Sequence, residues 1–187
     1  MNVDFAQWVP RPVGPRPQFG PNVDPIVAEA EGRHLYGTLN PKQKDACEAN
    51  LSVVNSTDSS TTGSRNLFLD GPGGSGKTYL YSCLHAIFQG KRLNVLTTAW
   101  TGIAASLLPN GQTTVSLFGL NLNNNFQTSS ITARSRRGAE LREAHVIIFD
   151  EASMLLKSAI ETAGQLLRDI ASNDLPFGGK VIVFGGD

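Results

Sequence analysis

The chain has 187 residues, of which 40% are hydrophobic and 17% are charged, a composition typical of one globular domain and not of a disordered or fibrous chain. Its 16 Lys and Arg residues balance its 16 Asp and Glu residues, so any contact with nucleic acid needs a local basic patch. Cys47 and Cys83 are too few for a disulfide framework or a metal cluster, and we interpret them as reduced thiols of an intracellular protein. No apolar run approaches the length of a membrane span and no signal-peptide stretch opens the chain, so we expect a soluble protein without membrane contact.

Prolines dominate the first part of the chain. Six of them lie between Pro10 and Pro25, among interleaved glycines. Because prolines at that density disfavour a regular helix or a central strand, we predict an extended arm or linker over residues 1–37. Trp8 and Phe19 are side chains that could dock this arm, and a mobile tail is the alternative.

Strands and helices are expected to alternate along the rest of the chain. Asn40 as N-cap and Pro41 as first helical residue predict a helix that runs to about Val54, followed by a polar loop over residues 55–64. Further strands are predicted over residues 66–70, 93–97, 146–149 and 181–184, and further helices over residues 77–88, 104–108, 139–142 and 155–170, with an irregular polar stretch over residues 120–137. This alternation favours an α/β fold with a parallel sheet and right-handed crossovers.

A glycine-rich motif, Gly71-Pro72-Gly73-Gly74-Ser75-Gly76-Lys77-Thr78, lies between the first of these strands and the helix that follows it. The glycines let the backbone curl so that its N–H groups point at phosphate oxygens, and the helix adds the positive end of its dipole. Lys77 would reach the β- and γ-phosphates, and the Thr78 hydroxyl would bind Mg²⁺. The motif therefore predicts a P-loop that binds ATP and Mg²⁺ through Gly71, Gly73, Gly74, Ser75, Gly76, Lys77, Thr78 and Tyr79.

Two acids follow a buried strand further along the chain. Residues 146–149 are apolar and deliver Asp150 and Glu151 to the carboxyl edge of the sheet, where such sheets bind their ligands. Asp150 would serve the metal, and Glu151 would act as general base toward the attacking water. We therefore predict Lys77, Asp150 and Glu151 as catalytic residues. A helix that begins with two acids is the alternative interpretation.

The motif at Asp150–Met154, Asp-Glu-Ala-Ser-Met, resembles the PIF family of superfamily-one DNA helicases, including those carried by Helitron transposons. Other segments look like further motifs of that family: Leu39–Gln43 like the Q-motif, Thr98–Ala105 like motif Ia, Gly111–Phe118 like the signature Gly-x-Thr-x-His-Ser-x-Phe, and Leu166–Ile170 with Pro176–Val181 like the run into motif III. The resemblance covers roughly residues 39–187 and leaves the proline-rich arm outside.

The resemblance implies a P-loop NTPase fold with a RecA-like parallel sheet flanked by helices over residues 38–187. It implies ATP hydrolysis coupled to translocation on single-stranded or forked DNA, 5′ to 3′, by a monomer in the nucleus or mitochondrion, with roles in DNA repair, recombination and telomere maintenance. Gln43 would read the adenine edge of ATP. The implied DNA contacts are Trp100, Thr101, Gly102 and Ser116, and Phe118 and Phe126 are further aromatic candidates for base stacking.

The sequence departs from the family pattern in two places. Val115 stands where the family usually has histidine, so a polar contact to DNA is in doubt. The chain also stops at Asp187, within motif III and before the glutamine that senses the γ-phosphate. We therefore expect a first motor domain that binds nucleotide, turns it over weakly and needs a second lobe to unwind DNA.

Two other function classes stay open at this point. One is an AAA+-type ATPase, which shares a P-loop and an Asp-Glu pair but not Gln43 or the Thr-Gly-Ile-Ala-Ala run. The other is a nucleotide-binding remnant that acts as a nucleotide-gated interaction module. The basic residues Arg134, Arg136, Arg137 and Arg142 are interpreted as a solvated face and not as a DNA patch.

Overall fold

The computed structural model describes residues 2–4, 23–56 and 65–187. Trp8, Phe19 and most of the predicted arm lie outside these residues. No helix in the described ranges is both long enough and apolar enough to cross a membrane.

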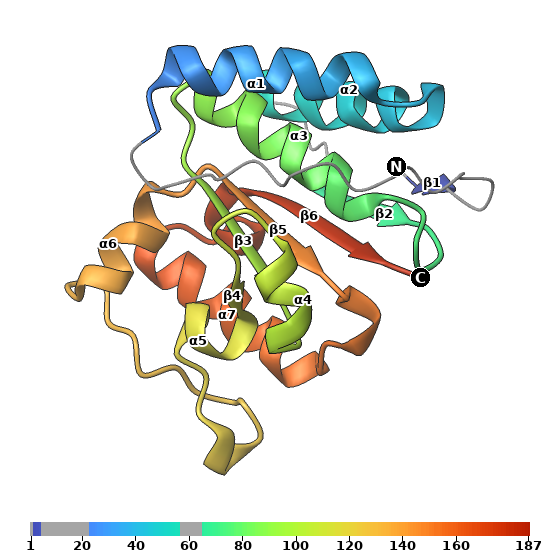
Figure 1. Cartoon of the computed structure of the whole chain (residues 1–187). Helices are drawn as coiled ribbons and strands as arrows, with labels where there is room; N and C mark the ends of the chain where they lie inside the picture. Colours follow the sequence, from blue (N-terminus) through green and yellow to red (C-terminus); the bar gives the residue numbers. More distant parts are fainter. Residues whose placement is uncertain (1, 5–22, 57–64) are drawn as a thin grey trace.

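A six-stranded sheet in the order β1-β2-β6-β5-β3-β4 forms the centre of the molecule (Figure 1). All of its strand pairs are parallel. The strands are β1 (Asn2–Asp4), β2 (Asn66–Asp70), β3 (Val95–Ala99), β4 (Gln112–Thr113), β5 (Val146–Asp150) and β6 (Val181–Gly186). The predicted α/β class with a parallel sheet is therefore confirmed.

Helices cover both faces of this sheet (Figure 1). One face carries α1 (Pro25–Thr38), α2 (Pro41–Asn55), α3 (Lys77–Gly90) and α4 (Gly102–Leu107), and the other carries α5 (Thr114–Phe118), α6 (Arg136–Glu143) and α7 (Lys157–Ala171). Three short 3₁₀ turns complete the described elements: η1 (Leu122–Asn124), η2 (Ala152–Met154) and η3 (Pro176–Gly179).

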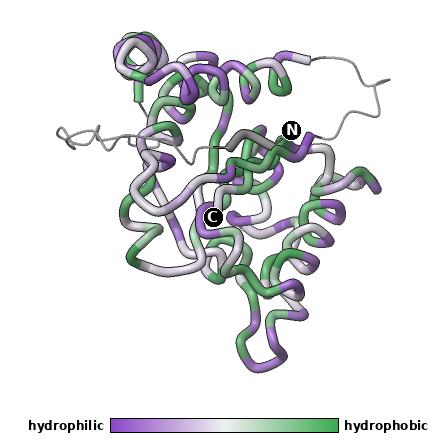
Figure 2. Tube along the Cα trace, turned by 90° about the vertical axis from the view of Figure 1, so that its right-hand side faces the viewer, coloured by the Kyte–Doolittle hydropathy of each residue, from purple (hydrophilic) through white to green (hydrophobic). Residues whose placement is uncertain are grey.

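Strand β5 shows how the sheet separates two apolar cores. Its residues Val146 and Ile148 face the core under α2 and α3, whereas Ile147 and Phe149 face the core under α7. All four side chains are fully buried, as expected for a central strand covered on both faces. Figure 2 shows the central strands as mainly hydrophobic, which agrees with the predicted buried strand. The carboxyl ends of β2, β5 and β3 consequently meet at one edge of the sheet.

The prediction of an arm without helix over residues 1–37 was wrong for residues 25–37. Helix α1 begins there because Pro25 occupies the first helical position and the Asp24 carboxylate accepts the N–H of Ile26. The helix packs closely on α3, since a Cβ on Gly32 would lie 2.9 Å from the backbone nitrogen of Ile87. Nearby, β1 pairs with β2 and forms the edge of the sheet.

Other boundaries differ by smaller amounts. The strand predicted over residues 93–97 lies two residues later, and α5 and β4 were not predicted at all. Helix α6 begins at Arg136 and not at 139, because the Ser135 hydroxyl caps it by accepting the N–H of Gly138. The stretch over residues 120–137 is otherwise irregular, as predicted.

Candidate nucleotide site and its DNA-facing edge

The P-loop connects β2 to α3 and presents unpaired N–H groups. Gly74 and Gly76 have φ values of 77° and 85°, a conformation that favours glycine, and Gly76 is the N-cap of α3. Among the described residues, the N–H groups of Gly73, Gly74 and Gly76 have no hydrogen-bond acceptor. A Cβ on Gly73 or Gly74 would meet nothing within 4 Å, so the loop is open to a ligand. Donors at the start of a long helix form a cradle for an anion such as phosphate.

Two side chains of the loop agree with a phosphate ligand. The Lys77 ammonium lies over the loop and donates to the carbonyls of Gly71 and Pro72. The Ser75 hydroxyl is buried, and its oxygen has no hydrogen-bond partner in the described part of the chain. A buried hydroxyl without a hydrogen bond lowers the stability of a folded protein. The Ser75 hydroxyl is therefore suited to bind a ligand in the loop. Thr78 is half-buried in the first turn of α3.

Gln43 and Tyr79 lie where the P-loop helix meets the start of α2. The backbone N–H of Gln43 donates to Asn40 Oδ1 (2.9 Å), and Asn40 N–H donates to Gln43 Oε1 (3.0 Å), which makes a capping box. The Tyr79 hydroxyl lies 2.6 Å from Thr38 Oγ1, and Tyr79 N–H donates to the carbonyl of Gly76. The polar groups of Tyr79 are thus engaged within the protein and tie α3 to the segment that carries Gln43.

Asp150 lies at the end of β5 and close to the P-loop lysine. Burial raises the pKa of its carboxyl, whereas the backbone N–H of Glu151, the charge of Lys77 and a hydrogen bond from Tyr81 lower it. The Tyr81 hydroxyl is fully buried and donates to Asp150 Oδ1 over 3.3 Å. The structure therefore brings the predicted metal carboxylate to the P-loop helix.

The oxygen atoms at this edge are suited to Mg²⁺ only together with a nucleotide. The described residues contain no group of three or more His, Cys, Asp or Glu side chains that could hold a metal ion by themselves. Mg²⁺ typically takes one or two protein oxygens and completes its shell with water and substrate phosphates. The Thr78 hydroxyl and the Asp150 carboxylate are donors of that kind.

Glu151 points to a different part of the edge. Its backbone has a φ of 56°, in the left-handed region. Its Oε2 accepts two hydrogen bonds from Thr101, one from the N–H (3.2 Å) and one from Oγ1 (2.9 Å). Thr101 Oγ1 also accepts the N–H of Ala104 and so caps α4. The structure thus joins the predicted general base to a predicted DNA-contact residue, a link that sequence reasoning missed because 50 residues separate the two positions.

Three of the four predicted DNA contacts lie side by side after β3. Gly102 is exposed, and a Cβ there would meet nothing within 4 Å. Trp100 is half-buried, with its ring edge-to-face against Phe126 at 5.3 Å. Ser116 is exposed on α5. Phe118 was wrongly proposed as a stacking residue, because it is fully buried against Phe149.

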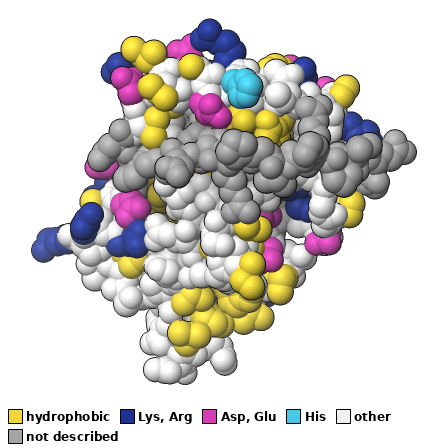
Figure 3. Space-filling model, viewed as in Figure 1, with side chains coloured by type: hydrophobic (Ala, Val, Ile, Leu, Met, Phe, Trp, Pro, Cys, Tyr) yellow, Lys and Arg dark blue, Asp and Glu magenta, His cyan; other side chains and the backbone are white. Residues whose placement is uncertain are grey.

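The surface over α4 is apolar and not basic. Ile103 and Leu107 on α4 are exposed, at 80% and 38% of their maximal area. Figure 3 shows hydrophobic side chains gathered on the face over α4 and α5. Contacts to bases at this surface would therefore depend on stacking and apolar packing more than on charge.

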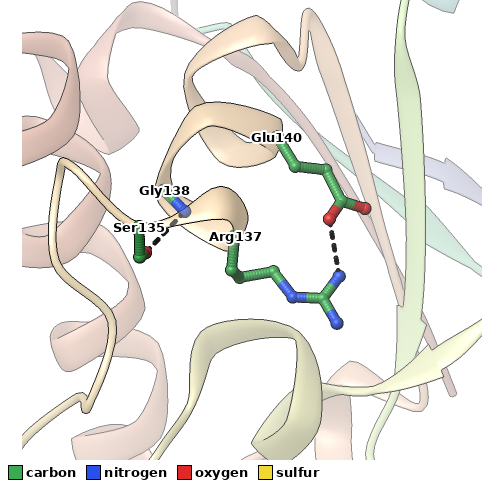
Figure 4. A network of polar contacts seen from close by, with 4 residues as sticks. All are labelled: Ser135, Arg137, Gly138 and Glu140. Atoms are coloured by element: carbon green, nitrogen blue, oxygen red, sulfur yellow. Dashed lines mark hydrogen bonds and ion pairs between the residues drawn. The ribbon is translucent and has the colours of Figure 1, made fainter.

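The basic cluster around α6 is partly neutralised within the protein. Arg137 pairs with Glu140 (2.8 Å), next to the cap formed by Ser135 and Gly138 (Figure 4). The Arg142 guanidinium donates to the carbonyls of Ala133 and Ile170. These internal contacts support the interpretation of the cluster as a solvated face.

Comparison with known proteins identifies relatives of most of this chain. Residues 38–187 match the family model described as PIF1-like helicase. The ATP-dependent DNA helicase Pif1 of Psychrobacter sp. is 37% identical over 126 residues, which are 66% of this chain and 19% of that protein. The crystal structure of Pif1 helicase from Candida albicans matches with a TM-score of 0.65 and 28% identity, over 80% of this chain and 32% of that one.

A second solved structure was determined with ligands. Pif1 helicase from Bacteroides in complex with ADP-AlF3 and single-stranded DNA matches with a TM-score of 0.61 and 26% identity, again over 80% of this chain and 32% of that one. The chain thus spans about a fifth of the curated relative and about a third of either solved chain. The matched region contains the P-loop, the Asp150-Glu151 pair and the whole RecA-like sheet from β2 to β6. On this evidence, the chain belongs to the PIF1-like helicase family.

Proposed function

We propose that this chain is the ATP-binding motor domain of an ATP-dependent DNA helicase, which couples hydrolysis of ATP with Mg²⁺ to 5′-to-3′ translocation on single-stranded DNA. The observation that carries the proposal is the P-loop with its unpaired N–H groups, next to an acid pair at the same sheet edge. The names of the relatives and the ligands of the Bacteroides structure support it.

The residues divide the chemistry between them. The P-loop N–H groups and Lys77 hold the phosphates and stabilise the charge that develops on them. The Thr78 hydroxyl and the Asp150 carboxylate would hold Mg²⁺, which neutralises charge on the β- and γ-phosphate oxygens. Glu151 accepts a proton from water as the water oxygen bonds to the γ-phosphorus and the bond to the bridging oxygen breaks, which releases ADP and phosphate. Gln43 reads the adenine edge.

The partner of this edge is single-stranded DNA or the single-stranded arm of a fork. Trp100, Thr101, Gly102 and Ser116 form the proposed contact, and the exposed apolar side chains of α4 extend it. From the motif resemblance, we further propose a monomeric motor in the nucleus or mitochondrion that acts in DNA repair, recombination and telomere maintenance.

Binding of a fluorescent ATP analogue and hydrolysis of labelled ATP, each with and without oligo(dT), test the proposal. Lys77→Ala should weaken nucleotide binding about 10- to 100-fold, the value of a lost charge-assisted hydrogen bond. Glu151→Gln should bind nucleotide normally but lose hydrolysis. Lys157→Ala is the control, because Lys157 is exposed on α7 and pairs with Glu161 on the same helix. Unchanged nucleotide binding in Lys77→Ala, or no binding of oligo(dT) to the wild-type chain, would contradict the proposed function.

A further inference from the structure

The two neighbouring acids at the end of β5 turn toward opposite sides of the strand. Asp150 accepts a hydrogen bond from the Tyr81 hydroxyl of α3, the helix that follows the P-loop. Glu151 accepts two hydrogen bonds from Thr101, the second residue after β3. Glu151 itself has a left-handed backbone with a φ of 56°, so the chain leaves the strand at this residue.

The order of the strands shows where these bonds hold the Glu151 carboxylate. β5 pairs with β6 on one side and with β3 on the other, and β2, which leads into the P-loop, lies beyond β6. At about 4.8 Å between neighbouring strands, the three spacings from β3 to β2 amount to about 14 Å. Thr101 therefore draws the carboxylate away from the side of the sheet that holds the phosphates.

Thr101 also belongs to the surface proposed to contact DNA. Gly102 and Ile103, the next two residues, are exposed. The Thr101 hydroxyl donates to Glu151 and accepts the N–H of Ala104, so it joins the acid to the first turn of α4. A ligand that shifts this turn must disturb the bonds to Glu151.

We propose that Thr101 is a positioning residue of the nucleotide site: it holds Glu151 away from the P-loop until a single strand binds at the start of α4 and frees the carboxylate to turn toward the nucleotide. The inference rests on the proposed function, in which Glu151 accepts the proton of the attacking water. The hydroxyl and the N–H of Thr101 would then couple the binding of DNA to the hydrolysis of ATP.

Nuclear magnetic resonance of the full ¹⁵N-labelled chain tests the release directly. The Thr101 N–H donates to a carboxylate in the wild type and lacks that acceptor in Glu151→Ala, so its resonance should differ between the two proteins. Saturating oligo(dT), with binding followed by fluorescence anisotropy, should remove most of this difference. A difference that persists with DNA bound overturns the inference.

Hydrolysis provides a second readout. Thr101→Val keeps the shape and the N–H but removes the hydroxyl donor, and it should raise DNA-free hydrolysis about fivefold at unchanged KM, the value of one hydrogen bond. Oligo(dT) should then stimulate this variant less than the wild type, and Thr101→Ser should restore the lower DNA-free rate. Thr113→Val is the matched control, because Thr113 caps α5 through Ser116 N–H in the same way but does not contact Glu151.

The outcomes separate this inference from the proposed function. Lower or unchanged DNA-free hydrolysis in Thr101→Val means that Thr101 supports the fold or the active geometry, which overturns the inference alone. Wild-type rates in Glu151→Gln, or no binding of oligo(dT), overturn the proposed function first. If no protein in the series turns over ATP, the Thr101 resonance decides the question.

Discussion

The Tyr81 hydroxyl lies 3.3 Å from Asp150 Oδ1 and joins the helix after the P-loop to the end of β5. Gly185 on β6 makes room for this contact, because a Cβ at that position would lie 1.6 Å from the same hydroxyl. Three segments of the site, at residues 81, 150 and 185, therefore depend on one buried hydroxyl.

Tyr81→Phe removes that hydrogen bond and keeps the ring. We expect about fivefold weaker binding of Mg²⁺-nucleotide, equivalent to a net hydrogen bond of about 1 kcal/mol, because Asp150 loses the donor that orients it. Binding of nucleotide without Mg²⁺ should stay unchanged, as measured by titration with a fluorescent analogue in the presence of chelator. Tyr36→Phe in α1 is the control, since that hydroxyl donates to Glu48 and lies outside the residues assigned to the site. Equal losses with and without Mg²⁺ would contradict a function through Asp150.

Gly185→Ala should destabilise the domain by more than about 3 kcal/mol, because the new methyl group collides with a fully buried tyrosine. Urea unfolding measures the loss. Adding Tyr81→Phe should recover only part of it, since the ring carbon that carries the hydroxyl would still lie 2.8 Å from the new Cβ. Gly37→Ala in α1 is the control: nothing lies within 4 Å of its Cβ, so stability should stay equal or rise. A stable Gly185→Ala variant would show that β6 can shift away from Tyr81.

Most of the fold could be predicted because its signals are local. The run Val146–Phe149 is apolar over its whole length, and such a strand must be covered on both faces. Asn40-Pro41 and Asp24-Pro25 each begin a helix with an N-cap residue followed by proline. The helix start at Asp24-Pro25 was not predicted, because it follows a run of prolines that indicates an extended arm. Helix α5 has only five residues, and its cap at Thr113 depends on a turn that periodicity does not reveal.

The candidate site could be predicted as a set of residues but not as a set of contacts. Lys77, Asp150 and Glu151 follow from motifs because each motif places its residue at the carboxyl edge of the sheet. The bond from Thr101 to Glu151 depends on strand order and on a left-handed backbone at a non-glycine residue. Neither property is visible in a single local pattern.

Gln43 has two possible functions that one substitution separates. Gln43→Glu keeps the oxygen that accepts Asn40 N–H, but the side chain is buried, so the new charge should lower the free energy of unfolding, which urea unfolding measures alongside. It removes the amide donor that would contact adenine, so the preference for ATP over GTP should fall about fivefold. Competition of the two nucleotides against a fluorescent analogue measures this preference. If the preference is retained, other groups read the base and Gln43 serves only as a cap.

His85 should make the domain sensitive to acid. It is fully buried in α3, and burial lowers its pKa from 6.5 to about 4. The unfolded chain therefore takes up the proton at a higher pH than the folded chain. The contribution of His85 to the free energy of unfolding is fully present above about pH 6.5 and is lost as the pH drops to about 4. The loss is roughly 3 kcal/mol, at about 1.4 kcal/mol per pKa unit.

Urea unfolding at about pH 7 and about pH 4 measures this loss, and His85→Gln should abolish it because glutamine does not titrate. The raised pKa of Asp150 acts in the opposite direction, since its neutral form is favoured in the folded protein and adds stability in acid. That contribution is common to both proteins and cancels in the difference between wild type and His85→Gln. His34→Gln, at an exposed position of α1, should leave the acid sensitivity in place. An equal pH dependence in the wild type and His85→Gln would mean that the buried imidazole accepts its proton without opening the core.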